Sequence, residues 1–152
     1  MIEFKNRIVI DRPVEEVFAF VADFENVPKW NYYVLEVNKT SAGPLGVGTT
    51  YHQTRKTDEQ DFGVIEYEPT ERVVVKTLPH AQPAFEMRFM FQPLEGGTQM
   101  TDAWKLDTGG PGLLERLGRG KVKQAVKENL VKLKELLETG SVQLQDGRTA
   151  VR

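Results

Sequence analysis

The chain has 152 residues, a length that fits one domain and is too short for two ordinary ones. Its 20 Lys and Arg residues against 22 Asp and Glu residues give a formal net charge of -2. This balance provides no overall field that would gather nucleic acid or an anionic membrane non-specifically. The absence of cysteine excludes disulfides, thiolate metal sites and a cysteine nucleophile.

The first residues, Met-Ile-Glu-Phe-Lys, have neither the basic start nor the apolar run of a signal peptide. No later stretch stays apolar for long enough to span a bilayer. We therefore expect a cytoplasmic protein without an integral membrane segment or a nucleic-acid partner. We expect it to be a monomer or a homodimer.

The first 30 residues of the sequence predict one strand followed by two short helices. Residues 2–10 alternate between apolar and polar side chains, as in a half-buried strand. Pro13 suits a first helical turn, and apolar residues recur at helical spacing over 14–21. Asp23 can cap a second short helical turn over 23–30.

From residue 32 onward the pattern changes to strands. Six are predicted, at residues 32–40, 48–57, 61–68, 71–78, 84–93 and 98–107. No helix interrupts them, and their links are too short for the crossover that parallel strands require. The sheet should therefore be antiparallel, and Gly109-Gly110-Pro111-Gly112 should separate it from the segment that follows.

Residues 113–138 carry the longest helical signal of the chain, with apolar side chains on one stripe and charged ones mostly opposite. Thr139-Gly140 should end this helix. The remaining residues are polar, which indicates a mobile tail. We therefore expect one domain over 1–138 and a mobile C-terminal tail over 139–152.

Four short motifs, taken in this order of elements, carry a family resemblance. They are Arg-Pro-Val-Glu-Glu-Val-Phe (12–18), Asp-Phe-Glu-Asn-Val-Pro-Lys-Trp (23–30), Gly-Val-Gly-Thr (46–49) and Gly-Gly-Thr (96–98). Up to about residue 138, the sequence resembles the polyketide cyclase/dehydrase-like branch of the START/Bet v 1-like (SRPBCC) superfamily. The resemblance implies an α+β helix-grip fold. In that fold a curved antiparallel sheet of about seven strands wraps a long C-terminal helix, and two short helices follow the first strand.

The resemblance also implies a cavity between sheet and helix for a hydrophobic molecule such as a lipid or a polyketide. A curved sheet that grips one helix leaves a concave space, which either side chains or a ligand can fill. The strand at 84–93 points an apolar row to one face, suited to lining a cavity and equally to filling a core. The predicted ligand-binding residues are Tyr33, Tyr51, Gln53, Phe85, Met87, Phe89, Phe91, Asp102, Trp104 and Asn129.

Asp102 is the main polar candidate, because alternation on the last strand turns it to the same face as Met100, Trp104 and Leu106. Burial would raise the pKa of its carboxyl group and would suit it to proton transfer or to anchoring a ligand. The alternatives are an ion pair with a nearby arginine or a place at the wet rim of the sheet.

Tyr51 and His52 are the other catalytic candidates. Alternation turns Tyr51 inward and His52 outward, unless a one-residue bulge exchanges the two faces. His80, in a loop, should be solvated at the rim. Asn129 interrupts the apolar stripe of the long helix, where it either meets a ligand or bonds to the sheet or a buried water.

Three functions remain open at this point. The first is a carrier of a hydrophobic small molecule, and the second is a cyclase/dehydratase-type enzyme that uses Asp102, Tyr51 or a histidine. The third is a protein-interaction module of the co-chaperone or ribosome-associated kind, which the resemblance implies because relatives of this superfamily include such proteins. The sequence contains no nucleophile elbow, phosphate loop or metal-binding motif, so we expect no cofactor or metal and favour binding over catalysis.

Overall fold

The computed structural model describes all residues from 1 to 152, and its main feature is one antiparallel sheet of seven strands. The strands are β1 (Ile2–Ile10), β2 (Val34–Lys39), β3 (Thr50–Arg55), β4 (Glu59–Glu68), β5 (Arg72–Thr77), β6 (Ala84–Leu94) and β7 (Gly97–Asp107). Their order in the sheet is β1-β7-β6-β5-β4-β3-β2. All seven predicted strands are present, and each neighbouring pair is antiparallel.

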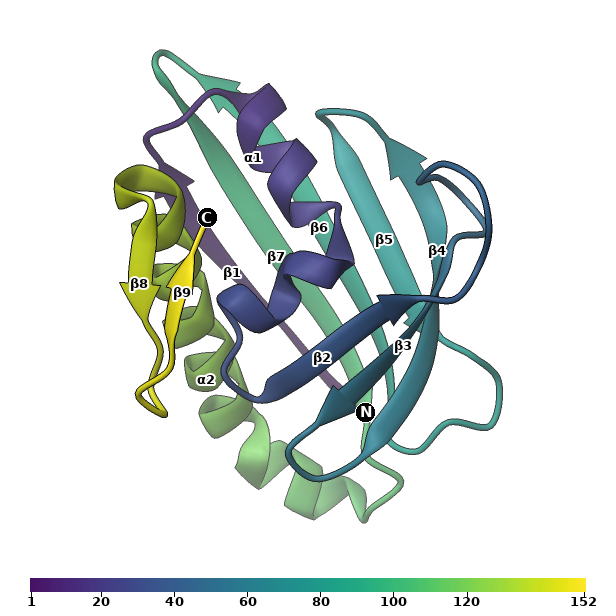
Figure 1. Ribbon diagram of the computed structural model, residues 1–152. Helices are drawn as coiled ribbons and strands as arrows, with labels where there is room; N and C mark the ends of the chain where they lie inside the picture. The colour runs from purple at the N-terminus through teal and green to yellow at the C-terminus, as the bar shows by residue number, and fades with distance from the viewer.

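Three helices complete the fold. They are α1 (Val14–Val21), the short 3-10 helix η1 (Phe24–Lys29) and the long α2 (Gly112–Thr139). The sheet curves around α1 and η1, and α2 runs alongside β1 (Figure 1). This arrangement confirms the predicted helix-grip fold. No helix of the chain is both long enough and apolar enough to cross a bilayer.

The two short helices fill one end of the space inside the curved sheet. Phe18 of α1 packs edge-on against Phe91 of β6, with ring centroids 5.2 Å apart. Phe24 of η1 packs against Phe89 of β6 at 6.1 Å and against Tyr51 of β3 at 5.6 Å. These aromatic rings make a solid core at this end, so open space is left only beyond them.

The C-terminal half of α2 covers this solid core. Leu130, Leu133, Leu136 and Leu137 follow the helical period and are completely buried. Gly140 then ends the helix with a φ of 92°, a left-handed conformation that glycine adopts without steric cost. This half of the helix is therefore held by apolar burial along one whole face.

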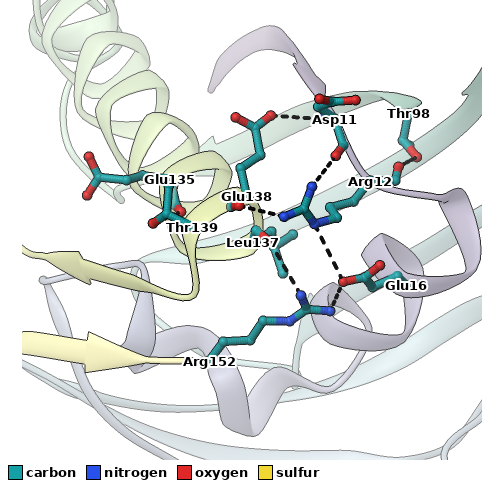
Figure 2. Close-up of polar contacts among 9 residues, drawn as sticks. All are labelled: Asp11, Arg12, Glu16, Thr98, Glu135, Leu137, Glu138, Thr139 and Arg152. Atoms are coloured by element: carbon teal, nitrogen blue, oxygen red, sulfur yellow. Dashed lines mark hydrogen bonds and ion pairs between the residues drawn. The ribbon is translucent and has the colours of Figure 1, made fainter. Parts of the chain in front are cut away.

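A polar cluster fixes the same end of α2 to the start of α1 (Figure 2). The Arg12 guanidinium donates to the Glu138 carbonyl oxygen at 2.5 Å, and the backbone N–H of Asp11 donates to the Glu138 carboxylate at 2.7 Å. Arg152 forms an ion pair with Glu16, so the last residue of the chain joins the same cluster. The end of α2 is therefore tied to the β1–α1 connection from two sides.

The structure departs from the prediction at the C-terminal tail. Where a mobile segment was expected, β8 (Ser141–Gln143) and β9 (Thr149–Val151) form a two-stranded hairpin that packs against α2. Val142 of β8 and Leu144, which follows β8, are buried, and Gly147 makes the turn of the hairpin with a φ of 93°. Four apolar residues scattered through a polar stretch are too few for a clear periodic signal, although they suffice to pack the hairpin on the helix.

Candidate functional site

Beyond the aromatic core, the fold encloses a cavity of about 410 Å³. It lies between the first half of α2, the inner face of the sheet and the residues of η1 and its C-terminal end. Its walls comprise 22 residues, of which 14 are hydrophobic. This volume and this composition are typical of sites that bind small molecules.

Three elements, β6, β7 and α2, supply half of the hydrophobic wall residues. Phe85 and Met87 come from β6, where they continue the row of Phe89 and Phe91 past the end that the short helices fill. Trp104 of β7 packs against Phe85 with ring centroids 5.7 Å apart. The first half of α2 contributes Val122, Ala125 and Val126 on the opposite side.

Seven of the ten predicted residues belong to the wall of this cavity: Tyr33, Gln53, Phe85, Met87, Asp102, Trp104 and Asn129. The other three, Tyr51, Phe89 and Phe91, lie in the aromatic core, outside the wall. The physical reason is the pair of short helices, whose Phe18 and Phe24 occupy the space over those three rings. Alternation predicted the inward face correctly, but it does not show how far along that face a second element packs.

Asp102 is buried in the apolar wall, as its position on the inward face of the last strand predicted. Asp102 is 1% exposed and forms no ion pair, and its Oδ1 atom is fully enclosed without a hydrogen-bond partner. Its strand neighbours across the sheet are Asn6, whose amide nitrogen donates to the Lys123 carbonyl oxygen instead, and Phe89. Burial raises the pKa of Asp102 to about 7, and the nearby Trp104 indole opposes this rise only in part.

Two further polar atoms of the wall are buried without a partner. They are the indole nitrogens of Trp30 and Trp104. An enclosed polar group that lacks a hydrogen bond costs about 1 to 3 kcal/mol of stability, so such groups are rare in folded proteins. Together with Asp102, three unpartnered polar atoms therefore belong to the wall of one apolar cavity.

The remaining polar wall residues are held by neighbours. Gln53 donates from its amide to the Gln60 side-chain oxygen at 3.0 Å, and Gln60 donates onward to the Pro83 carbonyl oxygen at 2.6 Å. The Asn129 side-chain oxygen accepts a bond from Gln145 at 3.4 Å. These bonds fix the two amides and leave the Gln53 oxygen and the Asn129 nitrogen without a protein partner.

Arg55 is the only cationic side chain of the wall. Its guanidinium makes two hydrogen bonds of 2.6 Å to the Asp58 carboxylate and lies 6.0 Å from the centre of the Tyr33 ring. Tyr33 is partly exposed, so this group stands where the cavity opens to solvent. The pairing with Asp58 neutralises the charge of Arg55 there.

The other two catalytic candidates lie away from the cavity. Burial raises the pKa of Tyr51 to about 12, and the ring is stacked on Phe62 in the core. His52 points outward, as predicted, and its Nδ1 atom lies 2.7 Å from the Asp61 carboxylate. Asp61, together with Glu59, raises the pKa of this histidine. No group of three or more acidic or histidine side chains is placed to hold a metal ion.

The sequence did not reveal all of the wall. Val122 and Val126 belong to the predicted apolar stripe of the long helix, and Leu106 belongs to the predicted inward face of the last strand. Neither these three residues nor Phe62 were predicted to line the cavity. Their periodicity is the same for a packed helix face and for a cavity wall. Only the spacing between α2 and the sheet separates the two cases, and no single-chain pattern encodes that spacing.

Several solved structures are similar to this chain. TTHA0849 from Thermus thermophilus matches with a TM-score of 0.74 at 19% identity, over 89% of this chain and 96% of that protein. The Aha1 dimer from Colwellia psychrerythraea matches with a TM-score of 0.69 at 19% identity, over 92% of this chain and 98% of that protein's chain. The di-domain ARO/CYC StfQ from the steffimycin biosynthetic pathway matches with a TM-score of 0.66 at 15% identity. The match covers 89% of this chain and 44% of that protein's chain.

At these identities the likeness shows a shared fold. No curated protein sequence matches this chain significantly. The family model described as "Polyketide cyclase / dehydrase and lipid transport" matches residues 1–138, which run from β1 to the last turn of α2. This match spans nearly the whole chain and agrees with the helix-grip fold. The chain therefore belongs to the polyketide cyclase / dehydrase and lipid transport family, within the START/Bet v 1-like superfamily.

Proposed function

We propose that this protein binds and carries an apolar small molecule that bears oxygen groups, in the cavity under the first half of α2. The observation that supports this proposal is the set of three unpartnered polar atoms, from Trp30, Asp102 and Trp104, in an otherwise apolar wall. A ligand that fills the cavity and offers hydrogen bonds would relieve the cost of leaving these atoms unpaired.

The chemistry of the three atoms narrows the class of ligand. An indole N–H only donates, so an acceptor oxygen on the ligand would satisfy Trp30, and a second one could satisfy Trp104, whose indole also lies near the Asp102 carboxyl group. Asp102, with its pKa raised to about 7, is present near neutral pH in both protonation states. It can therefore donate to a carbonyl oxygen or accept from a hydroxyl group. A neutral aromatic or acyl compound with carbonyl and hydroxyl groups meets these requirements.

The second candidate is a cyclase/dehydratase-type enzyme in which Asp102 moves a proton. A buried carboxyl group with a pKa of about 7 in the wall of an apolar cavity is matched to proton transfer at neutral pH. Against this candidate, the cavity offers Asp102 no second acid or base, because Tyr51 lies in the core and His52 faces outward. We therefore place binding first. The third candidate, a protein-interaction module, rests on a fold likeness, which does not transfer function.

Native mass spectrometry of freshly purified protein, followed by a titration with the neutral fluorophore phenylnaphthylamine, tests the binding proposal. The chain has two tryptophans and both belong to the cavity wall, so energy transfer from tryptophan reports a probe inside it. Val126→Phe should fill part of the cavity and weaken probe binding by about tenfold or more. Val131→Phe, on the 51% exposed face of the same helix, is the matched control and should bind normally.

Equal binding by the two variants would contradict the proposal, and so would the absence of any probe binding. Asp102→Asn separates carrier from enzyme once a co-purified compound is known. An enzyme should lose turnover of that compound in the variant. A carrier should hold the compound unchanged over time in both proteins.

A further inference from the structure

The first turns of α2 expose three leucines to solvent. Leu113, Leu114 and Leu117 are 69%, 63% and 71% exposed. Helical spacing places them on the side of α2 opposite to the stripe of Glu115 and Val122, which faces inward. A soluble helix normally keeps such residues on its buried face, so this outer face of α2 has no partner within the chain.

Basic side chains surround these leucines. Over residues 112–124, Arg116, Arg119, Lys121 and Lys123 stand against a single carboxylate, Glu115, which gives this segment a net charge of +3. Since the whole chain carries -2, the rest of it carries -5. Helical spacing puts Arg116 and Lys123 on one flank of the leucine face and Lys121 within it, between Leu114 and Leu117.

None of these four cations is neutralised within the chain. Every salt bridge of the structure involves other basic groups. Glu115 is turned inward, where its carboxylate accepts bonds from the N-terminal amine at 2.6 Å and from Thr108 at 2.8 and 2.9 Å. The one acidic group of the segment is therefore buried, whereas the positive charge is presented to solvent.

The basic surface continues onto the edge of the sheet. A shallow hollow of about 500 Å³ lies beside α2, and Arg119 and Lys123 form one side of it. Lys5 of β1 and Lys105 of β7 lie on its other side, and the whole hollow is lined by five basic and two acidic residues. The positive surface is therefore wider than the helix itself.

From the exposed leucines and the unpaired cations beside them, we infer that the first three turns of α2 dock on an anionic lipid bilayer. A helix with an apolar face and basic flanks lies in the plane of such an interface, with the apolar side chains among the acyl chains and the basic ones among the headgroups. A soluble polyanion would attract the cations and leave the leucines in water. The leucine face therefore favours the bilayer.

Docking would have a consequence for the cavity, and this consequence rests on the proposed function. Val122 and Val126 line the cavity from the inner side of the same helix. A bilayer in contact with the outer side would bring the cavity wall within one helix diameter of the lipid phase. An apolar ligand could then pass between bilayer and cavity along a short path.

Vesicle flotation tests the docking with the full chain. Two kinds of vesicle are compared, one of phosphatidylcholine and one in which a third of the lipid is phosphatidylglycerol. We expect binding to the anionic vesicles that is at least tenfold tighter and weakens with added salt. Replacing Leu113, Leu114 and Leu117 together by Ala should weaken this binding by about fiftyfold, since apolar area drives insertion. Lys121→Gln should weaken it by about fivefold.

Two matched controls accompany these variants. The first replaces the exposed Leu35, Val47 and Leu94, far from α2 in the sequence, by Ala, and the second is Lys76→Gln on β5. Both should bind like the original chain. Equal binding to the two kinds of vesicle would overturn the inference. Binding that depends on charge but not on the three leucines would point to a soluble polyanion and would also overturn it. Flotation needs no cavity ligand, so its outcome is independent of the phenylnaphthylamine titration.

Discussion

The two halves of α2 perform different tasks. The C-terminal half buries four leucines completely, ends at a left-handed glycine and is tied by Arg12 and Arg152 to the start of α1 (Figure 2). In the half from 112 to 126, Glu115 is the only buried residue. Its inner side lines a cavity instead of packing on side chains, and its outer side exposes leucines.

This difference separates stability from function along one helix. Segments with few buried apolar contacts open at low free-energy cost, and binding sites are commonly built from them. The half of α2 over the aromatic core holds the fold together. The half over the cavity has few buried apolar contacts and should open at a lower free-energy cost. Equivalent substitutions in the two halves should therefore change the free energy of unfolding by different amounts.

The largest expected difference is between buried and exposed leucines of α2. Leu133→Ala should lower the free energy of unfolding by about 3 to 5 kcal/mol, because it leaves a cavity in a packed core. Leu117→Ala should change it by less than about 0.5 kcal/mol, since the side chain is already in water. Urea denaturation measures both values. Similar losses in the two variants would contradict the division of the helix.

The next largest expected effect on stability concerns Asp102, in the wall of the cavity. Its pKa rises from 3.8 to about 7 on folding, so between these values the folded protein binds a proton that the unfolded chain has released. Stability therefore falls as the pH rises through this window, by up to about 4 kcal/mol. Asp102→Asn should abolish this loss, as measured by urea denaturation at about pH 5 and about pH 8.

The original chain is the reference for this measurement, because His52 titrates in both proteins. Its raised pKa also makes stability fall as the pH rises, so only the difference between the two proteins isolates Asp102. A difference that does not depend on pH would show that the Asp102 carboxyl group is not titrating inside an apolar cavity.

Much of this architecture could be predicted from the sequence. Alternation located every strand of the large sheet and the inward faces of β3 and β7, because a sheet with one buried face imposes a period of two. It therefore predicted correctly that Gln53, Asp102 and Trp104 point to the inner face of the sheet. Helical spacing located α1 and α2 in the same way.

Three features could not be predicted, each for a physical reason. How far Phe18 and Phe24 extend over the inner face of the sheet depends on packing between elements distant in sequence. That packing places Phe89 and Phe91 in the core and not in the cavity wall. The terminal hairpin depends on packing of Val142 and Leu144 against distant parts of the fold. The basic face of α2 is concealed by the acidic remainder of the chain, because the overall net charge averages over both.

The smallest expected effect compares glycines at the two ends of α2. Gly140→Ala should destabilise the protein by about 1 kcal/mol, because its φ of 92° strains any side chain. Gly118→Ala and Gly120→Ala should each stabilise it by about 0.5 to 1 kcal/mol, since both are helical and have open space around them. Thermal unfolding measures all three changes. Destabilisation by Ala at 118 or 120 would contradict the account of a loosely packed first half.

Hydrogen exchange along α2 tests the division of the helix most directly. Amides of residues 130–139 should exchange at least about a hundredfold more slowly than those of 113–124, because only the former open together with the core. Adding phenylnaphthylamine should slow exchange in the first half and leave the second unchanged. Uniform exchange along the helix, with a uniform response to the probe, would contradict the separation of an anchoring half from a cavity-lining half.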